Sequence, residues 1–266
     1  MREGASNQQS LIALPSPRPR TVFGPLADPL VAVLLAVLWV ALLLRFQLGG
    51  EWDLSTSGLF FDAANCAATA SAESQRCRGF PLSGVPALST FRELMHPVPA
   101  ILGIVTLVFL IVELRMGGTW RNPGVRLKAV LVATLIAGPG LIVNGVLKAH
   151  WGRPRPWMTE DFGGWLPFVE AGVYSNYCTS GNCSFVSGEA AAAGWLMCLA
   201  LVLAVHRYRA YAIVVGLLAI AMAGLRVGFG AHYLSDVVLG FLMTVVIFAA
   251  FAALAEWSVS RRARSG

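Results

Sequence analysis

The sequence predicts an all-α, polytopic membrane protein with six transmembrane helices and both chain ends on the cytoplasmic side. The first observation behind this fold class is composition: of 266 residues, 56% are hydrophobic and only 13% are charged, against about 25% charged in a soluble domain. The second is a set of long apolar stretches, and the third is an uneven distribution of lysine and arginine. The same composition excludes disordered, collagen-like and nucleic-acid-binding proteins, despite a net charge of +6.

The apolar stretches predict the membrane helices, since a bilayer core needs about 20 apolar residues in a helix. They run over Pro29–Phe46, Val98–Glu113, Ala129–Leu147, Val186–Val205, Tyr211–Leu225 and Val237–Ala255. A polar, proline-rich segment precedes the first stretch, so we interpret that stretch as a membrane span and not as a signal peptide. The predicted organisation is a flexible cytoplasmic tail over 1–28, a membrane domain over 29–257, and a basic cytoplasmic tail over 258–266.

The orientation follows from the positive-inside rule, because basic residues concentrate in cytoplasmic segments. The segments predicted to be cytoplasmic hold Arg2, Arg18, Arg20, Arg115, Arg121, Arg126, Lys128, Arg207, Arg209, Arg261, Arg262 and Arg264. The predicted outer loops are then 50–97, 148–185 and 226–236. Within the first of them, Leu54–Asp62 and Phe91–Met95 mix apolar and charged residues, as interfacial helices do.

Four cysteines form two close pairs in the outer loops, Cys66 with Cys77 and Cys178 with Cys183. Two local disulfides would suit an oxidising exterior or periplasm. Free buried thiols remain an open alternative, and the spacing of the cysteines and histidines fits no zinc pattern.

The residues suited to chemistry occur in three blocks. They are Lys148-Ala-His-Trp-Gly-Arg153-Pro-Arg155-Pro156, Ser184-Phe-Val-Ser187-Gly188-Glu189, and Arg226-Val-Gly-Phe-Gly-Ala-His232-Tyr-Leu-Ser-Asp236. With the predicted topology, all three blocks emerge on the outer face. Ionisable groups at the edge of a membrane domain are candidates for function, so this coincidence predicts a single site.

The residue types indicate phosphoryl chemistry. The four cations Lys148, Arg153, Arg155 and Arg226 would bind a compact, multivalent anion such as phosphate. Ser187 and Gly188 begin a predicted helix, where unpaired N–H groups and the helix dipole also favour phosphate. His232 can act as the nucleophile, and Asp236, one helical turn further on, can hold the imidazole in the required tautomer.

The three blocks resemble the signature of the type 2 phosphatidic acid phosphatase (PAP2) superfamily over residues 148–236. The resemblance implies a six-helix bundle in which Lys148, Arg155 and Arg226 bind phosphate, with Ser187 and Gly188 adding hydroxyl and backbone donors. It implies that His232 is the nucleophile, that Asp236 orients it, and that no metal or other cofactor takes part. Arg153 lies outside the family pattern.

Two positions depart from the family pattern. Glu189 stands where the family has the histidine that protonates the leaving group, and Leu225 replaces a serine before Arg226. Three roles are open for Glu189: a substitute general acid or site-tuning group, a structural carboxylate that neutralises the cations, or the mark of an inactive enzyme. Of these roles, the first is favoured. His150 is an alternative acid, although an interfacial role explains it more simply.

The predicted function is therefore an integral membrane lipid phosphatase that works through a phosphohistidine intermediate, in the inner membrane of a bacterium with its active site facing the periplasm. The segments Leu54–Asp62 and His150–Pro156 are similar to the bacterial branch that includes lipid A phosphatases, which favours lipid A or a related saccharolipid. The alternatives are undecaprenyl diphosphate, phosphatidylglycerophosphate, or phosphate transfer to a second lipid. A non-catalytic lipid-phosphate binder is a different class; it needs no nucleophile. The sequence leaves the oligomeric state open.

Overall fold

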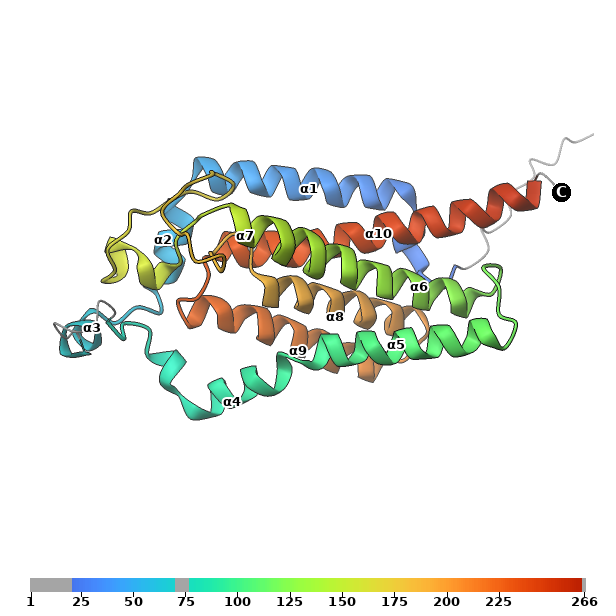
Figure 1. The fold of residues 1–266 in the computed structure, drawn as a ribbon, viewed down its shortest axis with the longest axis horizontal. Coiled ribbons are helices and arrows are strands. Elements are labelled where there is room, and N and C mark those ends of the chain that lie inside the picture. Colours follow the sequence, from blue (N-terminus) through green and yellow to red (C-terminus); the bar gives the residue numbers. More distant parts are fainter. Residues whose placement is uncertain (1–20, 70–76, 265–266) are drawn as a thin grey trace, which may run out of the picture.

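The computed structural model describes residues 21–69 and 77–264, and these residues contain helices but no strand. Six of the helices are long and apolar enough to cross a membrane, and they lie side by side along the long axis of the molecule (Figure 1). The fold class is therefore as predicted, an all-helical, multi-pass membrane protein.

The six spans lie close to the predicted stretches. They are α1 (Pro29–Leu48), α4 with α5 (Pro86–Met95 and Val98–Arg115), α6 with η3 and α7 (Pro123–Leu135, Ile136–Leu147 and Lys148–His150), α8 (Gly188–Val205), α9 (Arg209–Gly228) and α10 (Leu234–Arg264). The second span is longer than its apolar stretch because the interfacial segment expected around Phe91–Met95 forms α4, which leads directly into α5. Large apolar side chains on α1, α5 and α9 remain exposed, as a lipid-facing surface requires.

The third span changes its helical geometry before it reaches the candidate site. Residues Ile136–Leu147 form a π-helix with Pro139 inside it. A proline removes one N–H donor from the helical ladder. The side-chain amide of Asn144 donates to the Pro139 carbonyl at 2.6 Å, which satisfies an acceptor in this wider helix. The π-helix ends at Leu147, directly before Lys148, the first residue of the signature.

Helix α8 lies at the centre of the bundle and packs against α9 and α10. Its small residues allow close approach: a Cβ added at Gly194 would lie 2.3 Å from the Phe241 carbonyl oxygen of α10. At Gly240 of α10, an added Cβ would lie 2.8 Å from the carbonyl oxygen of Ser187. The first turns of α8 and α10 are therefore held against each other, which places the second and third signature blocks side by side.

The first outer loop folds over one end of the bundle. It contains α2 (Glu51–Gly58), α3 (Ala63–Thr69) and the 3-10 turn η2 (Pro81–Gly84). The expected interfacial segment Leu54–Asp62 therefore lies partly in α2. Both cysteine pairs form disulfides, Cys66 with Cys77 and Cys178 with Cys183. Phe61 and Phe80 pack edge to face or tilted against each other and against Phe162 of the second outer loop, beside the first disulfide, so the two loops share a small core.

The segments next to the chain ends are more ordered than expected. Residues 1–20 of the predicted N-terminal tail lie outside the described residues, but Phe23 is fully buried and packs edge to face on Phe248. Helix α10 continues to Arg264, so the predicted C-terminal tail is helical over most of its length. Helix α1 begins directly after residue 28, but packed residues precede it, and α10 continues past residue 257 without a break. The turn η1 (Gly24–Ala27) and the end of α10 lie at the same end of the bundle (Figure 1).

Candidate active site

The structure brings the three signature blocks together at the end of the bundle opposite to η1. Lys148 lies in the last turn of the third span, Arg226 lies in the last turn of α9, and Asp236 lies in the first turn of α10. Ser187 is the N-cap of α8. His232 lies in the short connection between α9 and α10, where its N–H donates to the Arg226 carbonyl at 3.1 Å.

Gly230 makes this connection possible. Its φ of +61° lies in the left-handed region that favours glycine. A Cβ at this position would also lie 2.3 Å from the ring of Phe80. The first outer loop therefore packs directly on the turn that presents His232.

The imidazole of His232 is buried and has a defined tautomer. Its Nδ1 lies 2.9 Å from the carbonyl oxygen of Ser184. A carbonyl can only accept, so Nδ1 carries the proton and the neutral ring leaves Nε2 unprotonated. Burial lowers the pKa of His232 well below its ordinary value, and three nearby cations lower it further. These cations are Arg155, Arg226 and Lys148.

Asp236 does not contact the imidazole in the way that the sequence spacing suggested. Its Oδ2 lies 4.0 Å from His232 Nδ1, too far for a hydrogen bond. Oδ2 instead accepts from the Ser184 hydroxyl and, at 3.1 Å, from the backbone N–H of Tyr233. Asp236 therefore holds Ser184, and the backbone carbonyl of Ser184 holds His232.

Arg153 is not part of the anion site, which corrects its grouping with the other cations. It is fully buried, and its guanidinium donates to Asp236 Oδ1 at 2.7 Å and to Asp53 Oδ2 at 2.8 Å. Its Nε donates to the Val169 carbonyl at 2.7 Å. Burial alone would lower the pKa of Arg153, but the two carboxylates raise it above its ordinary value. Arg153 is thus a permanent cation that fixes Asp236.

Asp53 of α2 is a site residue that the sequence analysis missed. It is fully buried, and its Oδ1 accepts from the backbone N–H of Ser235 at 2.8 Å. The Ser235 hydroxyl also donates to Asp53. Asp53 and Ser235 are 182 positions apart, so no local spacing could indicate the pair.

Helix α8 starts with a capped first turn that lies next to Asp236 and Asn144. The Ser187 hydroxyl accepts from the N–H of Ala190 at 3.3 Å, and its backbone N–H donates to the Asp236 carbonyl at 3.0 Å. A Cβ at Gly188 would lie 2.6 Å from Asn144 Oδ1, so only glycine lets the π-helix approach here. The first N–H groups of a helix have no intrahelical acceptor and favour phosphate.

Glu189 forms a two-point ion pair with Arg92. Its Oε1 accepts from Arg92 Nη2 at 2.6 Å and its Oε2 accepts from Arg92 Nε at 3.1 Å. Arg226 Nη1 lies 3.5 Å from the same Oε1. Arg92 comes from α4 and was not among the predicted site residues. The mixed apolar and charged residues of Phe91–Met95 predicted an interfacial helix in this segment but not the contact between Arg92 and Glu189.

The remaining cations line the same region. Arg155 Nη2 donates to the side-chain oxygen of Asn182 at 2.8 Å and to its carbonyl at 3.0 Å, in the loop closed by the Cys178–Cys183 disulfide. Lys148 is partly buried and interacts electrostatically with Arg155 and Arg226. Arg226 is 6% exposed, and its Nε is buried without a hydrogen-bond partner among the described residues.

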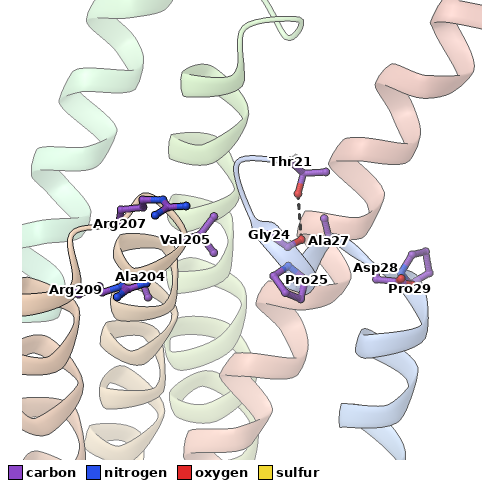
Figure 2. A pocket seen from close by; sticks show the side chains of 10 residues that line it. All are labelled: Thr21, Gly24, Pro25, Ala27, Asp28, Pro29, Ala204, Val205, Arg207 and Arg209. Atoms are coloured by element: carbon purple, nitrogen blue, oxygen red, sulfur yellow. Dashed lines mark hydrogen bonds between the residues drawn. The ribbon is translucent and has the colours of Figure 1, made fainter. Parts of the chain in front are cut away.

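Other parts of the described chain offer no competing centre. No three His, Cys, Asp or Glu side chains within residues 21–69 and 77–264 are grouped as metal ligands. His150 is exposed on the same end of the bundle. A cavity of about 610 Å³ lies at the opposite end, between η1 and the turn from α8 to α9 (Figure 2). It contains Arg207 and Arg209 but no residue of the three blocks.

Comparisons with known proteins agree with the geometry. The PAP2 superfamily matches residues 127–260. A lipid A 4'-phosphatase from Rhizobium leguminosarum is 46% identical over 84% of this chain and 96% of its own length. One from Rhizobium etli is 44% identical over 90% of each chain, and one from Francisella tularensis subsp. novicida is 42% identical over 41% of this chain and 49% of its own. No solved structure matches.

Proposed function

This chain belongs to the PAP2 superfamily, and we propose that it is a membrane phosphatase that removes a phosphate from a lipid headgroup, with lipid A as the favoured substrate. The observation that carries the proposal is the free Nε2 of His232, presented at one end of a membrane bundle among Lys148, Arg155 and Arg226. The relatives named lipid A 4'-phosphatase support the choice of lipid, because this chain covers 96% and 90% of two of them.

In the proposed reaction, His232 Nε2 attacks phosphorus in line with the bond to the headgroup oxygen. A P–N bond forms and the P–O bond breaks; the electron pair leaves with the headgroup oxygen, which becomes a hydroxyl by taking a proton from solvent, and solvent regains a proton when water attacks the phosphohistidine. Water then attacks the phosphohistidine, the P–N bond breaks, and its electron pair returns to Nε2. The products are the dephosphorylated lipid and inorganic phosphate.

The cations stabilise the charge that spreads over the phosphoryl oxygens. Lys148, Arg155 and Arg226 are the proposed phosphate ligands, and Ser187 and Gly188 add the donors at the start of α8. Support comes from the unsatisfied Nε of Arg226 and from the electrostatic proximity of the three cations. In this proposal, lysine and arginine charges perform the task, and the protein needs no metal or organic cofactor.

We assign Glu189 to site tuning and not to proton donation. Both of its oxygens accept hydrogen bonds from Arg92, and one also faces Arg226, an environment that favours the charged carboxylate. Asp236 acts through Ser184 and Arg153, as a positioning residue for the nucleophile. Replacing Glu189 with Gln tests this assignment: a loss of turnover with retained phosphate binding would instead support the acid role.

The proposed placement is the bacterial inner membrane, with the site on the periplasmic side and both chain ends in the cytoplasm. Two disulfides at the site end support this orientation, because disulfides persist in oxidising compartments. Basic residues at the other end, such as Arg207 and Arg209, support it independently. Residues 29–257 would form the membrane domain, together with the packed segment around Phe23.

The test is phosphate release by the purified protein in detergent, offered lipid A, undecaprenyl diphosphate, phosphatidylglycerophosphate and phosphatidic acid. We expect release from lipid A and none from the His232→Ala variant. His206→Ala is the matched control, because His206 lies at the opposite end of the bundle, where its Nε2 is 3.2 Å from the Val22 carbonyl oxygen. Equal turnover by His232→Ala would refute the proposal. Phosphate found on a second lipid would indicate a transferase, and binding without any product would indicate a lipid-phosphate binder.

A further inference from the structure

The exchange of the family histidine for Glu189 brings a cation into the site that no signature block contains. Arg92 pairs with Glu189 side-on, through Nε and Nη2, at 3.1 Å and 2.6 Å. A side-on pair occupies one edge of the planar guanidinium and leaves Nη1 outside the pair. Arg92 can therefore donate to a second anion without releasing Glu189.

Glu189 also brings two arginines together that would otherwise repel each other. Its Oε1 lies 2.6 Å from Arg92 Nη2 and 3.5 Å from Arg226 Nη1. Arg226 keeps a buried Nε with no partner among the described residues. One carboxylate thus fixes two guanidinium groups side by side, and each retains donors for another anion.

The position of Arg92 suits a contact with a lipid headgroup. It lies on α4, which packs on α9, the helix that carries Arg226, and continues into the membrane span α5. The side chain of Arg92 is 34% exposed, whereas that of Glu189 is 12% exposed. Arg92 therefore lies on the accessible side of the pair and Glu189 on the protein side.

From this geometry we propose that Arg92 is an additional phosphate-binding residue, held beside Arg226 by Glu189. The inference rests on the proposed function, since the anion is the phosphate monoester of the substrate lipid. Arg92 and Glu189 together take the place of the family histidine. The Glu189 carboxylate positions Arg92, and the Arg92 guanidinium binds the phosphate. The site thereby gains fixed N–H donors where the family has a titratable group, and the charges of Arg92 and Glu189 balance each other.

The test is a double-mutant cycle on binding of inorganic phosphate, measured by calorimetry with the full-length protein in detergent. Arg92→Gln is expected to weaken binding by about tenfold to a hundredfold, because charge-assisted hydrogen bonds to phosphate are strong. The decisive comparison uses the Glu189→Gln background, in which the introduced amide keeps one acceptor oxygen for Arg92. If Arg92 is a direct phosphate ligand, replacing it still weakens phosphate binding by about tenfold in the Glu189→Gln background. If Arg92 only neutralises Glu189, its replacement costs nothing in that background, and the proposal is overturned.

Arg45→Gln is the matched control. Arg45 forms an ion pair with Glu51 in the same outer region, at 3.4 Å, but both side chains are exposed and neither belongs to the site. We expect its phosphate affinity to equal that of the wild type. If Arg92→Gln does not yield folded protein, Arg92→Lys replaces it in the cycle; it keeps the charge but cannot pair side-on, and binding weaker by about threefold to tenfold is expected. Unchanged affinity would overturn the proposal.

The binding assay separates this inference from the proposed function. Wild-type protein that binds phosphate and follows the cycle, yet releases none from any lipid, would contradict the phosphatase activity and leave Arg92 as a ligand. If the wild type turns over lipid A but Arg92→Gln leaves phosphate affinity unchanged in the Glu189→Gln background, only the proposed role of Arg92 is contradicted. Wild-type protein that fails to bind phosphate at all would refute both.

Discussion

Asp53 offers the sharpest test of how the site is supported, because it is buried, charged and absent from the signature. Three donors converge on it: Arg153 Nη2 at 2.8 Å, the Ser235 N–H at 2.8 Å, and the Ser235 hydroxyl. Asp53→Ala removes the acceptor for all three in a region that water does not reach. The exposed fraction of Asp53 is 0%, so the donors have no alternative partner from solvent.

The expected loss of stability is about 3–5 kcal/mol. A buried donor that loses its acceptor costs about 1–3 kcal/mol, and removing one partner of a buried ion pair costs about 3–5 kcal/mol. We take the ion-pair range alone and add nothing for the other donors, because Arg153 keeps Asp236 as a charged partner at 2.7 Å. At about 2–4 °C per kcal/mol for a chain of this size, the apparent Tm should fall by about 10 °C.

The assay is thermal unfolding of the purified protein in detergent, followed by phosphate release at a temperature where both proteins remain folded. Glu51→Ala is the control on the same helix, because Glu51 pairs with Arg45 at the surface and such pairs contribute little. We expect its Tm to change by less than about 2 °C. An equally small change for Asp53→Ala would contradict the view that Asp53 anchors Arg153.

Three further predictions follow from contacts described above. Because burial lowers the pKa of His232, the unfolded chain binds more protons than the folded one just below pH 6.5. The Tm of the wild type should therefore decrease as the pH is lowered through that window, and the Tm of His232→Gln should decrease less. An equal pH dependence of the two proteins would refute the lowered pKa. Gly194→Ala should lower the stability of the protein by about 1–3 kcal/mol, because the new Cβ would meet the Phe241 carbonyl. Gly216→Ala should leave the Tm nearly unchanged in the same thermal-unfolding assay, because the nearest atom would lie 3.7 Å from its Cβ. Replacing both Cys178 and Cys183 with Ser should weaken phosphate binding several-fold, because Asn182, which holds Arg155, lies between them. The variant with Ser at both Cys66 and Cys77 serves for comparison. Unchanged phosphate affinity of the Cys178/Cys183 variant would show that the loop holds its shape without the disulfide.

The spans were predictable because membrane thickness fixes a minimum length for an apolar helix. The first predicted stretch, Pro29–Phe46, differs from α1 by two residues at its end. The larger differences arise where a polar helix continues an apolar one, as α4 does before α5. Hydropathy cannot mark the end of a helix whose last turns leave the lipid.

Within the site, the sequence located the residues whose spacing is local but not the contacts between them. His232 and Asp236 are one helical turn apart only if both are helical, and α10 begins at Leu234, after His232. The imidazole therefore turns to the Ser184 carbonyl instead. Arg153 was grouped with Arg155 because the two are neighbours in sequence, yet burial directs Arg153 to two carboxylates.

Arg92 and Asp53 could not be predicted for a different reason. Their partners lie 97 and 182 positions away, and no periodicity connects an outer-loop helix with the start of α8 or α10. Both residues are recognisable only once the first outer loop is folded over the end of the bundle.

The packing of the first outer loop also limits how the chain can be divided. The superfamily match begins at residue 127, yet Asp53 and Arg92 reach into the matched half from outside it. A fragment over 127–260 would contain His232 and every signature residue, but Arg153 and Glu189 would each lose an ion-pair partner. It would also lose Phe80, which covers Gly230 at the turn that presents His232. The matched half is therefore not an autonomous module, and chimeras with related chains should exchange residues 51–95 together with the signature blocks.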